Sequence, residues 1–355
     1  MKGRIALVVG SILFSLVVLE LGCRIVRGPQ WLVQWPNIIL QDRQRTQTDV
    51  TRRTVHDPQL GFVARPGYGY PGLHYDGRSF RVTPAPEGMA LADLEKRGPP
   101  ILVLGDSYAH GDEVADRETW PTRLQQLIRR RVVNGAMSGY GLDQMVLRAE
   151  HVVPELRPSA IVLSFIADDV RRTEMKRLWG AEKPWFEWVG GALELRNVPV
   201  PLPPRPEDTL SIWQRLFGRS LLVDTVLRHQ GWQYEWALDH VRVLSEAEGE
   251  RQLCPLMRRL AALGVPTLVV AEYDPYLWQD ADYAPVVRRV TGLVLTCAEA
   301  AGLATLDMFD AIDAAVRSTG LRTVYRDAHP SPVGTEIAAR RIAEALKQHK
   351  MASTQ

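Results

Sequence analysis

The chain has 355 residues, of which 46% are hydrophobic and 24% are charged, a composition that excludes a largely disordered protein. The length suits two modules, or one large α/β domain with insertions. The net charge of +2 gives no electrostatic reason to expect nucleic acid as a partner. Three widely separated cysteines exclude a disulfide scaffold and a cysteine-rich zinc module.

An apolar segment opens the chain. Lys2 and Arg4 precede it, and residues 5–26 are about as many as a helix needs to cross a bilayer. We expect residues 1–27 to form a signal anchor or transmembrane helix, with a cleaved signal peptide or a buried core helix as alternatives. The short basic start favours a cytoplasmic amino terminus. The sequence therefore predicts a single-pass protein of the cell membrane, with its main domain in the periplasm or outside the cell.

Strands and helices alternate over most of the remaining chain. Residues 28–98 are rich in Pro, Gly and Arg and predict a connector with irregular structure. Beyond them, residues 99–350 predict a domain in which short apolar strands are separated by helical patterns. The expected strands are residues 101–104, 132–133, 160–166, 266–271 and 304–306. This alternation is typical of the α/β class with a mainly parallel sheet.

Residues 173–250 interrupt the alternation and indicate an insertion. They hold six of the ten tryptophans, and residues 185–195 predict a β-hairpin around Gly190-Gly191. Two interpretations stay open. The tryptophans either pack a small core of their own or form a cap that lines a substrate groove.

Two short motifs carry the candidate chemistry. Gly105-Asp106-Ser107 comes after the first predicted strand, at the sheet edge where ligands bind in doubly wound folds. A serine there exposes its hydroxyl, and its own amide can face an oxyanion. A nucleophilic serine needs a base that is itself oriented by another group. Asp327-Ala328-His329 lies just before the final predicted helix and offers both groups.

Four separated blocks, in this order, resemble those of the SGNH (GDSL-type) hydrolases. The resemblance covers residues 98–347, and the preceding anchor resembles the membrane-anchored bacterial type. It implies a three-layer αβα sandwich of SGNH or flavodoxin-like form, carrying the insertion and the amino-terminal helix. The blocks are residues 104–108, 133–141, 161–169 and 327–334.

The resemblance also implies residue roles. Ser107 would be the nucleophile and His329 the base, with Asp327 orienting His329. The amides of Ser107 and Gly139 would donate to the oxyanion. The third donor of the family is an Asn side chain, but this chain has Asp168 there, and an ionised Asp only accepts hydrogen bonds. Asp168 would have to be protonated or point elsewhere, unless the local alignment is shifted by one residue.

The implied function is a serine esterase or deacylase. Its substrate would be an O-acyl ester on a cell-envelope or extracellular glycan, or a small ester. An O-acyltransferase on the same fold stays open, and so does a non-catalytic envelope binding or assembly module, which the Asp168 substitution motivates. No metal cluster or phosphate-binding glycine loop is present in the sequence, so no cofactor is expected. Cys254 and Cys297 fall on helical segments, where we expect two buried thiols rather than a disulfide.

Overall fold

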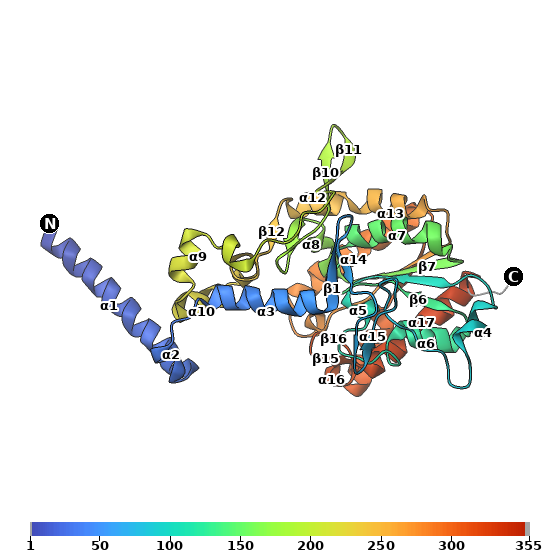
Figure 1. Ribbon diagram of the computed structural model, residues 1–355, viewed down its shortest axis with the longest axis horizontal. Coiled ribbons are helices and arrows are strands. Elements are labelled where there is room, and N and C mark those ends of the chain that lie inside the picture. Colours follow the sequence, from blue (N-terminus) through green and yellow to red (C-terminus); the bar gives the residue numbers. More distant parts are fainter. Residues whose placement is uncertain (1, 352–355) are drawn as a thin grey trace. The chain divides into compact units, whose positions relative to one another are not determined.

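The chain folds into two compact units. The computed structural model describes residues 2–351 (Figure 1). One unit, here called the amino-terminal unit, comprises residues 2–52, 177–182 and 202–241. The other, called the sheet unit, comprises residues 53–176, 183–201 and 242–351. The insertion predicted at 173–250 is therefore divided, since residues 183–201 belong to the sheet unit and most of the rest to the amino-terminal unit.

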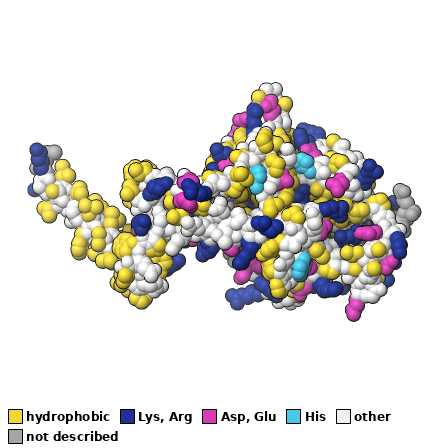
Figure 2. All heavy atoms as spheres, viewed as in Figure 1, with side chains coloured by type: hydrophobic (Ala, Val, Ile, Leu, Met, Phe, Trp, Pro, Cys, Tyr) yellow, Lys and Arg dark blue, Asp and Glu magenta, His cyan; other side chains and the backbone are white. Residues whose placement is uncertain are grey.

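The amino-terminal unit consists mainly of helices. Its first helix is long and apolar enough to cross a membrane, with a mean hydropathy of 2.4 over a window that is 0% buried. Figure 2 shows hydrophobic side chains along that helix. The helices are α1 (Lys2–Arg27), α2 (Gln30–Val33), α3 (Ile38–Arg53), the 3-10 helix η1 (Pro206–Thr209), α9 (Ile212–Phe217), α10 (Leu221–His229) and α11 (Gln233–Trp236).

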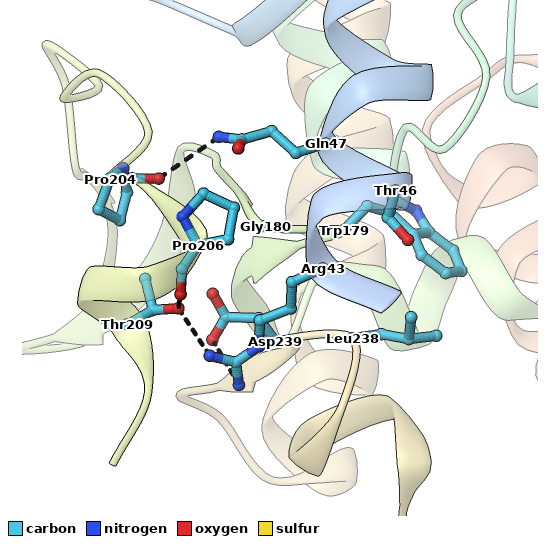
Figure 3. Close-up of a pocket in the computed structure, with 10 residues that line it drawn as sticks. All are labelled: Arg43, Thr46, Gln47, Trp179, Gly180, Pro204, Pro206, Thr209, Leu238 and Asp239. Atoms are coloured by element: carbon cyan, nitrogen blue, oxygen red, sulfur yellow. Dashed lines mark hydrogen bonds and ion pairs between the residues drawn. The ribbon is translucent and has the colours of Figure 1, made fainter. Parts of the chain in front are cut away.

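Polar contacts hold α3 inside this unit. Arg43 is buried, and its Nη1 donates to Thr209 Oγ1 at 2.6 Å. Its Nη2 lies 3.7 Å from Asp239 Oδ1. Figure 3 shows these groups around a cavity of about 10 Å³, enough for roughly one water molecule. The cavity is thus a small defect in packing and not a space for a substrate.

A five-stranded parallel sheet forms the centre of the sheet unit, in the order β14-β13-β7-β5-β6. The α/β prediction is confirmed. Every residue of β5, β7 and β13 is buried, as expected for strands covered on both faces. The strands are β5 (Ile101–Leu104), β6 (Val132–Asn134), β7 (Ala160–Phe165), β13 (Thr267–Ala271) and β14 (Ala304–Asp307).

Helices cover both faces of the sheet, which makes the three-layer sandwich that the resemblance implied (Figure 1). Val103 and Val270 point to one face, where they pack with Trp120 and Ile342, and all four side chains are fully buried. Burying such a side chain contributes about 1.5–3 kcal/mol. This face carries α6 (Trp120–Ile128), α15 (Phe309–Thr319) and α17 (Pro332–Gln348); the other carries α7 (Leu142–Leu156), α13 (Leu253–Ala261) and α14 (Tyr283–Ala300).

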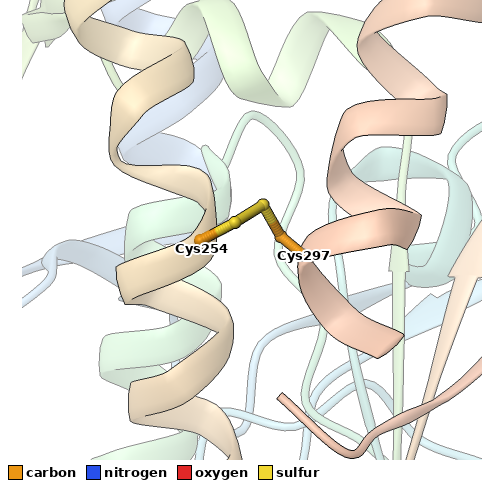
Figure 4. The surroundings of a disulfide bond; sticks show 2 residues. All are labelled: Cys254 and Cys297. Carbon is orange, nitrogen blue, oxygen red and sulfur yellow. A yellow bond between two sulfur atoms is a disulfide. The ribbon is translucent and has the colours of Figure 1, made fainter. Parts of the chain in front are cut away.

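A disulfide joins two of these helices. Cys254 of α13 and Cys297 of α14 form it, with their Cα atoms 4.6 Å apart (Figure 4). The expectation of two buried thiols was wrong. The two cysteines are 43 residues apart in sequence, and only the packing of α13 against α14 brings them together.

The predicted hairpin is present as β10 (Trp185–Val189) and β11 (Ala192–Arg196), paired around Gly190 and Gly191. Both glycines have positive φ, which the tight turn requires. Three short strands fall at sequence boundaries between the units: β8 (Met175–Leu178), β9 (Ala181–Glu182) and β12 (Val241–Arg242). The other elements are β1 (Thr54–Asp57), β2 (Gly61–Ala64), β3 (Gly69–Tyr70), β4 (Leu73–His74), α4 (Leu91–Glu95), α5 (Ser107–His110), α8 (Ala167–Arg172), α12 (Glu246–Arg251), η2 (Pro275–Trp278), α16 (Leu321–Val324), β15 (Tyr325–Arg326) and β16 (His329–Pro330).

Candidate active site

Ser107 is the first residue of α5, and only Gly105 and Asp106 separate it from β5. Gly105 makes the turn possible, because a Cβ there would lie 2.7 Å from both the Ala109 Cβ and the Ser164 carbonyl oxygen. Asp106 caps the helix by accepting a hydrogen bond from the Tyr108 amide at 2.9 Å. The Ser107 amide opens the helix, so it has no intrahelical acceptor. The turn therefore holds both the hydroxyl and the amide of Ser107 at the carboxyl edge of the sheet.

His329 contacts Ser107 from the opposite end of the domain sequence. Its Nε2 lies 2.9 Å from Ser107 Oγ. His329 belongs to β16, and the Tyr108 hydroxyl donates to the Ala328 carbonyl oxygen at 2.6 Å. The β15–β16 hairpin is thus fastened to the helix that carries Ser107. The structure brings together the serine and histidine that the sequence singled out.

The carboxylate beside His329 is that of Glu113. Its Oε1 lies 3.0 Å from His329 Nδ1. This differs from the prediction, which assigned the orienting role to Asp327. Arg326 pairs with His329, so Asp327 occupies the two-residue turn between β15 and β16, where it is exposed with φ 50°. With only one residue between Asp and His, the Asp lies in the turn itself and not on the strand beside the imidazole.

Sequence reasoning missed Glu113. It has a left-handed backbone, φ 66°, in the loop after α5. The Arg326 side chain donates to its carbonyl oxygen at 3.3 Å, which ties this loop to the β15–β16 hairpin. Left-handed backbone at a non-glycine residue is uncommon and tends to cluster at functional sites. The available signal was a carboxylate six positions after the nucleophile, which is too common to be diagnostic.

The loop containing Gly139 is anchored beside the nucleophile turn. The Met137 amide donates to the Gly105 carbonyl oxygen at 3.0 Å. Ser138 Oγ donates to Asp112 Oδ2 at 2.6 Å, and the other Asp112 oxygen contacts His110 Nδ1 at 2.6 Å. Burial opposes ionisation of Asp112, but His110 and these hydrogen bonds outweigh it and lower its pKa. Gly139 has φ 81°, and among the described residues its amide has no hydrogen-bond acceptor.

Asp168 is turned toward two arginines. Its Oδ1 accepts from Arg171 Nε at 2.6 Å, and its Oδ2 accepts from Arg172 Nε at 2.9 Å. Burial alone would raise the pKa of Asp168, but Arg172 and Arg171 outweigh burial and lower it. Asp168 is therefore ionised at neutral pH and accepts hydrogen bonds. The protonated state considered from the sequence does not fit these surroundings.

Further acidic groups lie buried behind the nucleophile turn. Arg172 Nη1 lies 2.7 Å from Asp169 and 3.8 Å from Asp106. Burial raises the pKa of Asp106, and burial together with Asp106 raises the pKa of Asp169 well above its ordinary value. Glu272, the residue after β13, accepts a hydrogen bond from Ser164 Oγ, and burial raises its pKa to about 7. Across residues 2–351, no group of three or more His, Cys, Asp or Glu side chains is arranged to hold a metal ion.

These contacts define a class of protein. A serine at a strand-to-helix turn touches a histidine whose second nitrogen touches a carboxylate, an arrangement typical of serine hydrolases on α/β sheets. The GDSL-like lipase/acylhydrolase family model matches residues 103–337, and the chain belongs to this family. It is accordingly a serine ester hydrolase.

Solved structures with a similar fold share little sequence with this chain. An alpha/beta hydrolase from the metagenome of Lake Arreo, Spain, has 17% identity and a TM-score of 0.45, covering 70% of this chain and 95% of its own. A lipolytic G-D-S-L family protein from Veillonella parvula has 14% identity and a TM-score of 0.43, covering 71% and 100%. An acetyl xylan esterase from Geobacillus stearothermophilus has 14% identity and a TM-score of 0.43, and the match covers 70% of this chain and 94% of the esterase. Comparison with curated proteins gives no match.

Proposed function

We propose that the chain hydrolyses O-acyl esters through an acyl-serine intermediate on Ser107. His329 acts as the base and then as the acid, and Glu113 takes the orienting role that the resemblance gave to Asp327. The observation that carries this proposal is the 2.9 Å contact of Ser107 Oγ with His329 Nε2, on an imidazole whose Nδ1 lies 3.0 Å from Glu113. That arrangement supports a working catalytic serine over a decayed hydrolase used only for binding.

The reaction can be derived from these contacts. When the Nδ1–H group of His329 donates a hydrogen bond to the Glu113 carboxylate, Nε2 keeps a free lone pair that can accept the Ser107 proton. Ser107 Oγ then bonds to the ester carbonyl carbon, and the imidazolium is stabilised by the Glu113 carboxylate. The carbon–oxygen bond to the alcohol breaks, and the leaving alcohol takes the proton from His329. A water molecule then gives a proton to His329 and adds to the acyl carbon. The bond from that carbon to Ser107 Oγ breaks, Oγ takes the proton back from His329, and the carboxylic acid is released.

The oxyanion would be held by the amides of Ser107 and Gly139. Asp168 has no place among the donors in this proposal, because its carboxylate is ionised and bonded to Arg171 and Arg172. Removing one hydrogen-bond donor from an oxyanion hole lowers kcat by about 10²–10³. We therefore expect a two-amide oxyanion site with modest turnover.

We further propose a location and a substrate class. α1 would anchor the chain as a single-pass protein of the cell membrane, with the sheet unit outside the cytoplasm. The Cys254–Cys297 disulfide supports an oxidising compartment. Esters met there include acylated glycans of the envelope and small extracellular esters, and we propose these as the substrates.

A fluorophosphonate probe tests the proposal on the full-length chain in detergent. We expect wild type to be labelled covalently and Ser107→Ala to be unlabelled, with ester hydrolysis lower by roughly 10⁴-fold or more. Ser318→Ala, which removes an exposed hydroxyl on α15, is the matched control and should behave as wild type. A folded wild type that neither reacts with the probe nor hydrolyses envelope esters would overturn the proposal. Turnover that requires an added sugar alcohol would instead identify an acyltransferase.

A further inference from the structure

The helix α9 carries its large apolar side chains outward. Ile212, Trp213, Leu216 and Phe217 are 67%, 59%, 61% and 47% exposed. Their spacing places all four on one face of the helix, while Gln214 on another face is buried. The Trp213 and Phe217 rings stack at 5.9 Å. Figure 2 shows hydrophobic side chains gathered over this part of the chain. A soluble surface rarely leaves such a cluster open to water.

Specific contacts fix this region to the end of α1. Glu20 of α1 accepts hydrogen bonds from Ser220 Oγ at 2.7 Å and from the Leu222 amide at 2.9 Å, at the start of α10. Arg24 of α1 is fully buried and donates to the Arg219 carbonyl oxygen at 2.6 Å. The segment between α9 and α10 is therefore bonded to the last two turns of α1.

The end of α2 and the segment after it add two more exposed apolar residues. Val33 is 84% exposed and Trp35 is 46% exposed. The Arg24 guanidinium lies 3.3 Å from the centre of the Trp35 ring, and Arg219 donates to the Trp35 carbonyl oxygen. We name the interfacial patch as the six residues Val33, Trp35, Ile212, Trp213, Leu216 and Phe217.

The length of the uncharged part of α1 indicates what covers the patch. Residues 5–19 span about 22 Å as a helix. The hydrocarbon core of a bilayer is roughly 30 Å thick. A span shorter than the hydrocarbon core thins the bilayer around it, which brings the membrane interface closer to apolar groups beside the end of the span. Glu20 and Arg24 come directly after this stretch, and they bond residues 219–222, which follow the α9 part of the patch in sequence. These bonds bring α9 close to the point where the charge-free stretch ends.

We propose that the interfacial patch inserts into the outer headgroup region of the same bilayer that α1 crosses. This inference rests on the proposed anchoring role of α1. Tryptophan is favoured at that depth because its ring is apolar and its N–H reaches water or lipid headgroups. Arg215 lies between patch residues of α9, Arg219 comes two residues after Phe217, and Arg27 comes six residues before Val33. Long basic side chains at a membrane interface extend their charged ends to the lipid phosphates. The amino-terminal unit would then rest on the membrane surface and not hang from a flexible tether.

The test uses the full-length chain in phosphatidylcholine vesicles, in a Cys23→Ser background that keeps the Cys254–Cys297 disulfide. Separate variants carry an environment-sensitive fluorophore at Trp213→Cys, at Phe14→Cys in α1, and at Leu127→Cys on α6 of the sheet unit. Phe14 and Leu127 are 71% and 40% exposed. Quenching is compared between lipids brominated near the headgroup and lipids brominated deep in the acyl chain.

We expect the label at 213 to be quenched more strongly by the shallow bromines, as for a group about 5–10 Å into the boundary region. The label at 14 should be quenched by deep bromines and the label at 127 by neither. If 14 is quenched and 213 behaves like 127, α1 spans the membrane but the interfacial patch does not insert. If 213 is shielded from water without quenching, a protein covers it, and the inference is again overturned. If 14 itself is unquenched, the anchor proposal fails, and this inference fails with it. Phe217→Cys repeats the test should Trp213→Cys fold poorly.

Discussion

The two units place their apolar side chains in opposite ways. In the sheet unit, strands β5, β7 and β13 are buried along their whole length, and α6 and α17 pack their apolar faces against them. In the amino-terminal unit, α1 and α9 expose their large apolar side chains, while Arg24 and Arg43 are buried and hydrogen-bonded. A chain that folds against water hides its apolar surface. The difference agrees with the proposal that a lipid bilayer covers the exposed apolar side chains of the amino-terminal unit.

The candidate chemistry shows the same division. Ser107, His329 and Glu113 all belong to the sheet unit, where packed strands hold the loops that carry them. The amino-terminal unit offers a cavity of about 10 Å³, enough for roughly one water molecule. Under the two proposals the sheet unit is the catalytic one and the amino-terminal unit is the membrane-associated one. Variants in each unit should then produce different kinds of defect.

After Ser107→Ala, the largest effect is expected for Glu113, the carboxylate beside His329. Glu113→Gln should lower kcat by about 10²–10⁴, because a neutral amide no longer stabilises the imidazolium or its tautomer. Asp327→Asn should change kcat by less than about threefold, since its side chain is exposed in the turn. Steady-state hydrolysis of a soluble ester by both variants decides the assignment. If Asp327→Asn causes the larger loss, Asp327 is the orienting group after all.

Two substitutions by alanine compare a buried side chain of the sheet unit with an exposed one of the interfacial patch. Ile342→Ala in the buried face of α17 should cost about 2–5 kcal/mol in the free energy of unfolding. Leu216→Ala in the interfacial patch should cost less than about 0.5 kcal/mol in detergent, because that side chain is 61% exposed. Denaturant unfolding monitored by circular dichroism measures both. Equal costs would mean that α9 is packed against protein and would erase the contrast between the units.

Burial of acidic groups should give the sheet unit a distinctive pH dependence. Burial raises the pKa of Glu272 to about 7 from the ordinary 4.5, so the folded chain holds a proton that the unfolded chain has lost between those values. Stability therefore falls as pH rises through this window, by roughly 3 kcal/mol for this group.

Glu272→Gln should remove the contribution of Glu272 to the decrease of stability with pH. Between pH 5 and pH 8 the variant should therefore lose less stability than wild type does. The pKa of Glu174 is also raised by burial to about 7, so a slope of the same sign remains in the variant. Glu344→Gln, on the exposed side of α17, is the control and should leave the slope unchanged. Unfolding midpoints at pH 5 and pH 8 test this. An unaltered slope in Glu272→Gln would show that Glu272 is ionised in the folded chain.

The smallest effect is expected at Asp168. Asp168→Asn should not raise the rate of hydrolysis by more than about threefold. Arg171 and Arg172 hold the side chain at this position, so we expect an amide there not to donate a hydrogen bond to the oxyanion. A gain of about 10²–10³ would instead show that an amide at 168 completes the oxyanion site. Initial rates with a soluble ester distinguish these results.

Much of the sheet unit was predictable because its signals are local. Continuous apolar runs of a few residues predicted all five central strands, and the alternation with helices predicted a parallel sheet. Gly105-Asp106-Ser107 and His329 could be singled out because a nucleophile needs a base and both lie where strands end. The Gly190-Gly191 turn predicted its hairpin for an equally local reason, the need for positive φ.

The remaining features depend on which distant segments meet. Glu113 reaches His329 from a position 216 residues earlier in the chain, and Cys254 meets Cys297 only because α13 packs on α14. The partition of residues 173–250 between two units is likewise set by contacts and not by composition.

The sequence by itself determined the order of strands and helices, the apolar first helix and the serine–histidine pair, because periodicity and backbone preference act between near neighbours. Tertiary structure alone decided which carboxylate faces His329, that Asp168 is bound to Arg171 and Arg172, and that α9 presents its apolar face outward. Those outcomes depend on distances and burial across the fold, which spacing along the chain does not encode.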